Sequence, residues 1–364
     1  MTLRFLHGAD FHLDSPFSAL PPRQAAERRR ELRQLPQRLA EWTESHPVDL
    51  VLLSGDLLDS ASVYRDTAEA LRDALGRMDA PVFIAPGNHD WYGPGSPYAA
   101  MPWPENVHIF SRPEPEAAEL PEGNTVVYGA AFTGPERGGS PLADFRVPED
   151  GRRHLMVLHG ELDGTQPRYA PIASADAAGS GLHYLALGHI HSRGARQLGR
   201  TLCAWPGCPE GRGFDETGDK GFYYGEMDDG GGTRLEFVPF ALRRYETVTA
   251  DVTGKPPLAA VEAALPSDTA RDLYRITLTG ETEQAVDLQA LQRALEGRFC
   301  ALTLTDDTRT AENVWARAEE DSLRGLFLRE LRRRLAEAST EEERRTIEQA
   351  ARYGLAALDR RDLG

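Results

Sequence analysis

The sequence predicts an α/β domain in which helices cover a β-sheet. In the first two hundred residues, five short apolar runs each end abruptly in a cluster of Gly, Asp, His or Asn. Runs of four to six apolar residues bounded by Gly and Pro are typical of buried strands. Helical patterns separate the first three runs, and alternation of strands and helices favours a sheet flanked by helices.

The five predicted strands lie at 3–6, 49–53, 81–85, 155–158 and 184–187. The polar clusters follow directly, in the order Asp10-Phe-His12, Gly55-Asp56-Leu-Leu-Asp59, Gly87-Asn88-His89-Asp90, His159-Gly160 and Gly188-His189-Ile-His191. Ligands in open α/β sheets gather at the carboxyl ends of strands, because the loops there share one edge. We therefore expect these clusters to converge.

Two helices are predicted between the first three strands. The first covers about 24–45, with Pro36 as a possible kink, and carries an apolar stripe of Leu32, Leu35, Leu39 and Trp42. The second covers 66–78, with Ala68, Leu71 and Leu75 on one face. Apolar residues at three-to-four spacing predict helices packed on the sheet.

The chain changes character after His191. A closing strand is predicted at 236–245, followed by a strand at 274–278, a helix at 288–295 and a strand at 301–305. Two amphipathic helices follow residue 321, with the stripes Leu323, Leu326, Phe327, Leu331, Leu335 and Ile347, Ala350, Ala351, Leu355, Leu358. Ser339-Thr340 followed by Glu343 predicts a capping box. The predicted domains are 1–245, a small α+β domain at 246–308 and a helical segment at 309–364.

Composition indicates a globular protein, with 40% hydrophobic and 27% charged residues in a chain of 364. No apolar run reaches eighteen residues, which excludes a membrane span, and the N-terminus lacks the apolar region of a secretory signal. Cys203, Cys208 and Cys300 lack the spacing of a metal or disulfide framework. We expect reduced thiols in a cytoplasmic protein.

The formal net charge of −16 counts against nucleic acid as a partner, because an acidic protein repels it at long range. Bound divalent cations would offset this locally by about four positive charges. The basic residues are also nearly all Arg, which binds phosphate well, with Lys only at 220 and 255.

The residue types of the clusters fit a pair of divalent cations that hydrolyse a phosphate ester. Two ions about 3.5–4 Å apart neutralise the phosphate and lower the pKa of a bound water, and one carboxylate must bridge them. Asp56 is the natural bridge. The other candidate ligands are Asp10, His12, Asn88, His159, His189 and His191. This mixed nitrogen and oxygen set favours Mn, Fe or Zn.

His89 is not needed as a ligand, which makes it a candidate to stabilise the transition state or protonate the leaving oxygen. We expect Asp90 to hydrogen-bond the second nitrogen of His89 and hold the ring charged. Asp59 is expected to orient a ligand.

Each short motif taken alone is more often part of a surface or a core than a ligand set, whereas five motifs at five strand ends favour a site. His7 is either a partner of a ligand or a packing residue. An aromatic stretch either stacks a base or packs under a Pro/Gly-rich loop, and it contains Trp91, Tyr92, Tyr98 and Trp103.

These five motifs resemble the signature blocks of the calcineurin-like metallophosphoesterases. The resemblance implies a four-layer α/β (α+β) sandwich, with two β-sheets flanked by helices, a small α+β cap domain and C-terminal helices. It also assigns Asp10, His12, Asp56 and His191 to one metal, and Asp56, Asn88, His159 and His189 to the other.

Within that superfamily, His7-Gly-Ala-Asp-Phe-His-Leu-Asp-Ser-Pro-Phe17 is similar to the opening block of SbcD-type DNA-repair exonuclease subunits. The segment with Trp205, Arg212, Glu216 and Lys220 resembles the block after their last ligand, which makes Arg212 and Lys220 candidates for substrate binding. The resemblance implies a Mn-dependent DNA exonuclease, possibly also an endonuclease. It also implies that the terminal helices dock on the coiled coil of an SMC-like ATPase (SbcC type), and a homodimer is possible.

Two other functions stay open. One is a phosphodiesterase or phosphatase for nucleotides or other small phosphate esters, although some 120 residues lie beyond the predicted catalytic core. The other is an inactive interaction subunit that keeps the fold, although a scaffold has no reason to retain buried carboxylates that repel one another.

Overall fold

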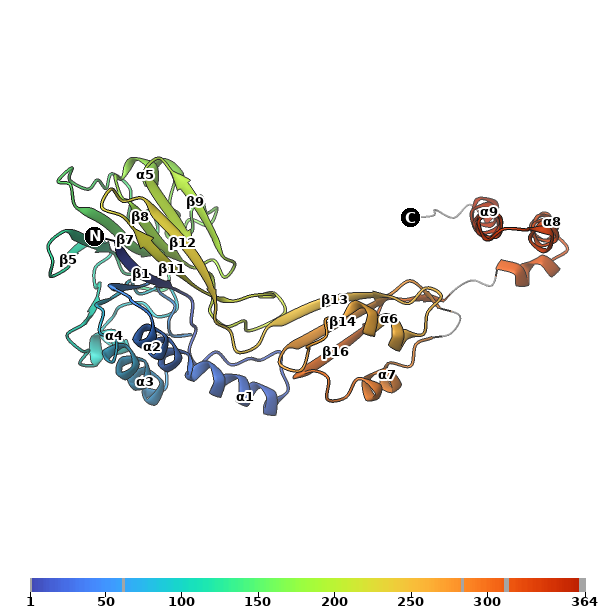
Figure 1. Cartoon of the computed structure of the whole chain (residues 1–364), viewed down its shortest axis with the longest axis horizontal. Helices are drawn as coiled ribbons and strands as arrows, with labels where there is room; N and C mark the ends of the chain where they lie inside the picture. Colours follow the sequence, from blue (N-terminus) through green and yellow to red (C-terminus); the bar gives the residue numbers. More distant parts are fainter. Residues whose placement is uncertain (1, 61–62, 283–284, 311–313, 360–364) are drawn as a thin grey trace. The chain divides into compact units, whose positions relative to one another are not determined.

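The computed structural model describes residues 2–60, 63–282, 285–310 and 314–359 (Figure 1). The chain divides into two compact units, each described by itself below. The first comprises 1–247 with the short segments 269–274 and 299–301, and the second comprises 248–268, 275–298 and 302–364. Among the described residues, no helix is both long and apolar enough to cross a membrane.

Two six-stranded sheets form the first unit. One has the order β12-β11-β1-β2-β3-β4, with bounds β1 (Leu3–Gly8), β2 (Leu50–Leu53), β3 (Val82–Ile84), β4 (Val107–Ile109), β11 (Gly221–Met227) and β12 (Thr233–Pro239). The other has the order β5-β6-β7-β8-β10-β9, with bounds β5 (Glu116–Glu119), β6 (Thr125–Gly129), β7 (Arg153–His159), β8 (Tyr184–Gly188), β9 (Gly194–Leu198) and β10 (Thr201–Trp205). Strands β1 to β4 pair in parallel, as do β6, β7 and β8.

The helices of this unit lie outside the two sheets (Figure 1). They are α1 (Pro22–Arg33), α2 (Leu35–Ser45), α3 (Arg65–Gly76), α4 (Pro97–Ala100) and α5 (Ser174–Gly179). The single helix predicted at 24–45 is wrong in one respect, because it is two helices that meet at Gln34. Pro36 explains the break, since its ring cannot donate the hydrogen bond that would continue a helix from the preceding turn.

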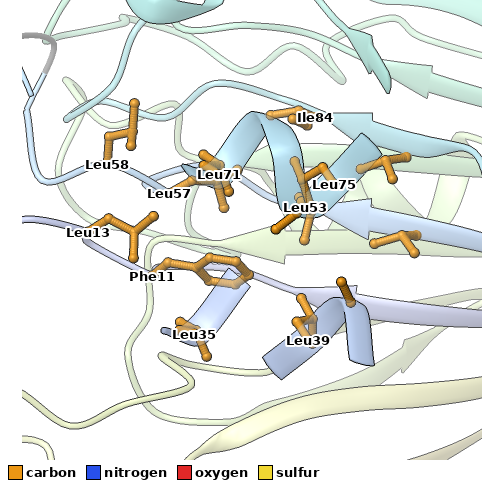
Figure 2. Close-up of a cluster of buried hydrophobic side chains, with 14 of the residues drawn as sticks. Phe11, Leu13, Leu35, Leu39, Leu53, Leu57, Leu58, Leu71, Leu75 and Ile84 are labelled. Atoms are coloured by element: carbon orange, nitrogen blue, oxygen red, sulfur yellow. The ribbon is translucent and has the colours of Figure 1, made fainter. Parts of the chain in front are cut away.

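Three apolar layers hold these elements together. Phe5 and Leu52 of the first sheet pack with Val157 and Ala186 of the second to fill the space between the sheets. The outer face of the first sheet packs on α2 and α3, and Figure 2 shows leucines of both helices around Leu53. The outer face of the second sheet packs on α5. The predicted sandwich of two sheets flanked by helices is therefore confirmed.

The predicted closing strand at 236–245 is wrong in its bounds. Strand β12 ends at Pro239, and Tyr245 begins the next strand, β13 (Tyr245–Asp251). The intervening turn is held by Glu210, whose carboxylate accepts a hydrogen bond from the Leu242 amide at 2.7 Å. Strand β13 pairs in the order β13-β14-β16 with β14 (Leu273–Thr279) and β16 (Ala301–Asp306).

The remaining elements up to residue 310 are α6 (Pro257–Ala264), α7 (Leu288–Ala294) and a small pair of strands, β15 (Glu281–Thr282) and β17 (Arg309–Thr310). The strands and helix predicted at 274–305 match β14, α7 and β16. The sequence analysis predicted no helix between 245 and 274 and so missed α6, which begins at Pro257. Proline is also favoured at the first position of a helix, where its missing N–H has no partner to lose.

The end of the described chain contains the short 3₁₀ helix η1 (Val314–Glu319), α8 (Leu323–Glu337) and α9 (Glu341–Asp359). Leu328 of α8 is buried with Ala351 and Leu355 of α9. The predicted stripe on α8 is wrong in part, because Leu323 and Leu326 are 69% and 60% exposed. The capping box is confirmed by reciprocal 3.1 Å hydrogen bonds between Thr340 and Glu343.

Candidate metal centre

The five polar clusters meet at the carboxyl ends of strands from both sheets. The first three follow β1, β2 and β3, and the last two follow β7 and β8. The Asp10 amide donates to the Gly55 carbonyl at 3.0 Å, and the His189 amide donates to the Asp10 carboxylate at 2.9 Å. Convergence is as expected, but two sheet edges supply the clusters where the sequence interpretation assumed one.

Several candidate ligands lie at strained backbone positions. Asp10, His12, Asp56 and His189 have φ values of 55°, 46°, 51° and 87°. Residues with a side chain rarely adopt this left-handed region, and such strain clusters at functional sites. Gly55 shows how tight the packing is, since a Cβ there would lie 2.8 Å from the Ala85 carbonyl oxygen. The surrounding loops therefore hold these side chains in place at a conformational cost.

A first group of possible ligand atoms comes from Asp10, His12 and His191. The Nδ1 atoms of the two rings lie 3.1 Å and 2.7 Å from the carboxylates of Asp59 and Glu216. A carboxylate accepts, so Nδ1 of each ring donates, and in a neutral ring Nε2 is then bare. These two Nε2 atoms lie 3.2 Å apart. Two neutral rings at this distance place their lone pairs face to face, and a cation that accepts both relieves the repulsion, so the donor set fits a metal ion.

A second group comes from Asp10, Asp56 and His159. His159 Nδ1 lies 2.9 Å from the Ser54 carbonyl oxygen, which can only accept, so Nε2 is again bare. That Nε2 lies 2.9 Å from Asn88 Oδ1 and 3.4 Å from Asp56 Oδ2. A nitrogen lone pair thus faces two oxygens, which is a second arrangement that a cation would relieve.

The carboxylate of Asp56 faces both groups. Its Oδ2 lies 3.8 Å from His12 Nε2 and 3.4 Å from His159 Nε2. Burial, followed by the charge of Asp90, raises the pKa of Asp56 to about 7, and burial raises the pKa of Asp10 to about 6. In the absence of a cation, the charged forms of these two buried carboxyls therefore cost free energy.

His189 lies at the edge of the cluster. Its ring centroid is 5.2 Å from that of His159 and 5.0 Å from that of Tyr169. It is not among the groups of mutually close His, Cys, Asp and Glu ligand atoms found in the described residues. Burial lowers the pKa of His189 to about 3, so the ring is neutral and can bind a metal.

His89 is exposed beside His12 and Asp56, and these three also form a group of close possible ligand atoms. Its Nδ1 lies 3.0 Å from the Asp59 carbonyl oxygen, so Nδ1 donates and Nε2 is the nitrogen that can meet a substrate. The expected hydrogen bond from His89 to the Asp90 side chain is wrong, because His89 uses the Asp59 backbone instead.

Asp90 is buried and binds loop amides. Its carboxylate accepts from the amides of Asp56, Leu57 and Gly87 at 2.7–3.1 Å and from the Tyr98 hydroxyl at 2.6 Å. A carboxylate with this many donors ties the second cluster to the third. Tyr98 is buried, so its ring packs inside the protein and is not available to stack on a base.

The two basic residues predicted to bind substrate, Arg212 and Lys220, contact residues next to the candidate ligands or the ligands themselves. The Arg212 guanidinium is within 2.7 Å of Glu216 and 3.5 Å of Asp59. The Lys220 side chain is buried, and its ammonium donates to the His191 carbonyl at 3.0 Å.

Sequence reasoning left Glu216 out of the candidate site, although it lies in the segment that follows the last ligand. Although burial alone would raise it, hydrogen bonds from His191 and Arg212 hold the pKa of the Glu216 carboxyl far below its usual range. His7 proves to be a packing residue that joins the two sheets. It is buried and contacts the Tyr184 hydroxyl at 2.8 Å and Ser54 at 3.0 Å.

Comparisons with known proteins agree with this geometry. The family model described as calcineurin-like phosphoesterase matches residues 3–193. The chain is 32% identical over 270 residues to the uncharacterized metallophosphoesterase YhaO of Bacillus subtilis, covering 71% of this chain and 65% of that protein.

Two further relatives are 26% identical to this chain. One is the SbcD component of the nuclease SbcCD of Bacillus subtilis, with 59% of this chain and 64% of that protein covered. The other is the DNA double-strand break repair protein Mre11 of Aeropyrum pernix, with 56% and 53% covered. The chain thus spans between about half and two thirds of the length of these relatives. Because the family model covers more than half of it, this chain belongs to the calcineurin-like phosphoesterase family.

Proposed function

We propose that the chain is a two-metal phosphodiesterase that cleaves DNA, with Mn²⁺ as its working ion. The observation that carries the hydrolytic part is a pair of close contacts between possible ligand atoms, one between Nε2 of His12 and Nε2 of His191 and one between Nε2 of His159 and Oδ1 of Asn88. Both arrangements fit a divalent cation with nitrogen and oxygen ligands.

We assign Asp10, His12, Asp56 and His191 to one ion, and Asp56, Asn88, His159 and His189 to the other. When bound, the ions would neutralise the phosphate and lower the pKa of a bound water. Burial lowers the pKa of His12 and His159, which keeps these two imidazoles neutral. Asp59 keeps the His12 ring in the orientation that points Nε2 to the cluster.

His89 is the proposed catalytic residue that is not a ligand. The Asp59 carbonyl fixes its ring through Nδ1, so Nε2 can donate a hydrogen bond to a phosphate oxygen or a proton to the leaving oxygen. Asp90 acts indirectly by holding the loop that carries Asn88 and His89. A scaffold without activity would have no use for the buried, mutually repelling pair Asp10 and Asp56.

DNA is the proposed substrate because of the resemblance to SbcD-type subunits and the names of two relatives, which are a component of a nuclease and a DNA double-strand break repair protein. The net charge of −16 is the observation that favours the alternative, a small phosphate ester such as a nucleotide. Both substrates would use the same metal ligands.

An SMC-like ATPase is the proposed partner, with 309–364 as its docking segment and 246–308 as a DNA-facing cap. Leu323 and Leu326 support this assignment, because large apolar side chains so exposed on one helix are typical of interaction surfaces. All three cysteines are free thiols, which supports the proposed cytoplasmic location.

One assay separates the substrates. End-labelled double- and single-stranded DNA is incubated beside cyclic and simple nucleotides with Mn²⁺, with a chelator control and an Asp56→Asn control. We expect chelator-sensitive shortening of DNA that the variant lacks. Cleavage of nucleotides alone would replace DNA by a small ester, and no cleavage of any substrate by metal-loaded protein would contradict the enzyme.

A further inference from the structure

The Arg212 side chain touches two carboxylates that come from different loops. It is only 18% exposed, and its Nη2 donates to Glu216 Oε1 at 2.7 Å while its backbone amide donates to Glu216 Oε2 at 2.8 Å. Its Nη1 lies 3.5 Å from Oδ1 of Asp59, which follows β2. One planar guanidinium, with donors in a fixed fork, thus holds two acids at once.

Each of these acids holds one imidazole of the first ligand group. Glu216 Oε1 lies 2.7 Å from His191 Nδ1, and Asp59 Oδ1 lies 3.1 Å from His12 Nδ1. The far nitrogens of the two rings then meet at 3.2 Å. The result is a closed ring of contacts in the order His191, Glu216, Arg212, Asp59 and His12.

The positions of the protons follow from this ring. A neutral imidazole that binds a cation through Nε2 carries its one proton on Nδ1, and that proton goes to the carboxylate. Arg212 Nη2 also lies 2.9 Å from His191 Nδ1, but both atoms would then be donors and cannot share a hydrogen bond. In the metal-binding state Arg212 Nη2 therefore donates to Glu216, and the positive charge of Arg212 offsets the negative charge of this buried acid.

We propose that Arg212 is a positioning residue that orients His12 and His191 together, through Asp59 and Glu216, and so sets the affinity of one of the two metal sites. This inference rests on the metal centre proposed above. It replaces the substrate-binding role expected for Arg212 from the sequence, because its guanidinium is already engaged with carboxylates of the protein.

The test measures metal binding rather than turnover. Metal-free wild-type protein, Arg212→Met, Arg212→Lys and Glu216→Gln are titrated with Mn²⁺ by calorimetry, and the visible absorption of bound Co²⁺ reports ligand geometry. Loss of an outer partner of a ligand typically weakens metal binding about 10–100-fold. We expect a loss of this size at one site, an unchanged second site and an altered Co²⁺ spectrum. Lysine should not restore affinity, because a single ammonium cannot span both acids.

Glu210→Gln is the matched control. Glu210 is also a buried glutamate, six residues before Glu216, and it pairs with Arg28 at 3.1 Å and Arg38 at 2.9 Å instead of with a ligand. It should lower the melting temperature and keep both metal affinities. Wild-type affinities in Arg212→Met and Glu216→Gln, or an equal loss in Glu210→Gln, would overturn the inference. If Arg212→Met does not fold, Arg212→Lys and Glu216→Gln carry the test. Wild-type protein that binds fewer than two ions would contradict the proposed function instead.

Discussion

Asp56→Asn removes the charge of the carboxylate that faces both proposed metal sites, while keeping its size. In the metal-free fold, burial and the nearby Asp90 raise the pKa of Asp56 from 3.8 to about 7. The unfolded chain keeps the lower pKa, so with rising pH the unfolded state releases its proton first. The free energy of unfolding therefore decreases from about pH 4 and levels off above about pH 7.

The size of this effect follows from the two pKa values. Their difference corresponds to about 4 kcal/mol at 25 °C. For a unit of this size, that lowers the melting temperature by on the order of 10 °C. Metal-free Asp56→Asn should therefore melt on the order of 10 °C above metal-free wild-type protein at pH 8, and close to it at pH 4.

Thermal unfolding of chelator-treated proteins across this pH range measures the difference. Adding Mn²⁺ should then reverse the order, because a ligand that binds only the folded state stabilises wild-type protein. A difference in melting temperature that is the same at every pH would refute the reasoning about Asp56. So would a variant that retains the full metal content of wild-type protein.

Four other outcomes are expected. His89→Asn should abolish turnover and keep two metals per chain by elemental analysis, whereas normal activity would remove its catalytic role. Metal affinity should increase with pH through about 6–7, because Asp10 and Asp56 must lose protons to bind; calorimetry that finds pH-independent affinity would contradict this. Tyr98→Phe should lower the free energy of unfolding by about 2 kcal/mol, as expected for a hydrogen bond to a charged group, and urea titration would measure it. Deleting residues 321–364 should spare hydrolysis of a small diester and abolish co-purification with the ATPase. Continued co-purification would show that these helices are part of the folded core and not the docking segment.

The strands that position the site were predictable because each ends in a polar cluster. Strands buried on both faces are continuous apolar runs, as Leu50–Leu53 is, and the abrupt change to Gly55-Asp56 marks the end of the ladder. What periodicity did not predict is that β7 and β8 belong to a second sheet, since a buried parallel strand has the same pattern in either. The two-sheet arrangement came from the family resemblance.

The partners of the ligands were harder to predict than the ligands. Asp90 follows His89 in the chain, yet its side chain turns to loop amides because a buried carboxylate needs several donors. Glu216 contacts a ring 25 residues away, and no local pattern encodes such a contact. On α8 the exact helical register decided which leucines are buried, so Leu328 took the place expected for Leu323 and Leu326.

The central claim is that two cations share Asp56. Crystals grown with Mn²⁺ and measured at the manganese absorption edge test it directly through the anomalous difference map. We expect two peaks about 3.5–4 Å apart, one near His12 and His191 and the other near Asn88 and His159, with Asp56 between them. A map with no peak at these side chains, or with peaks that Asp56 does not touch, would contradict it.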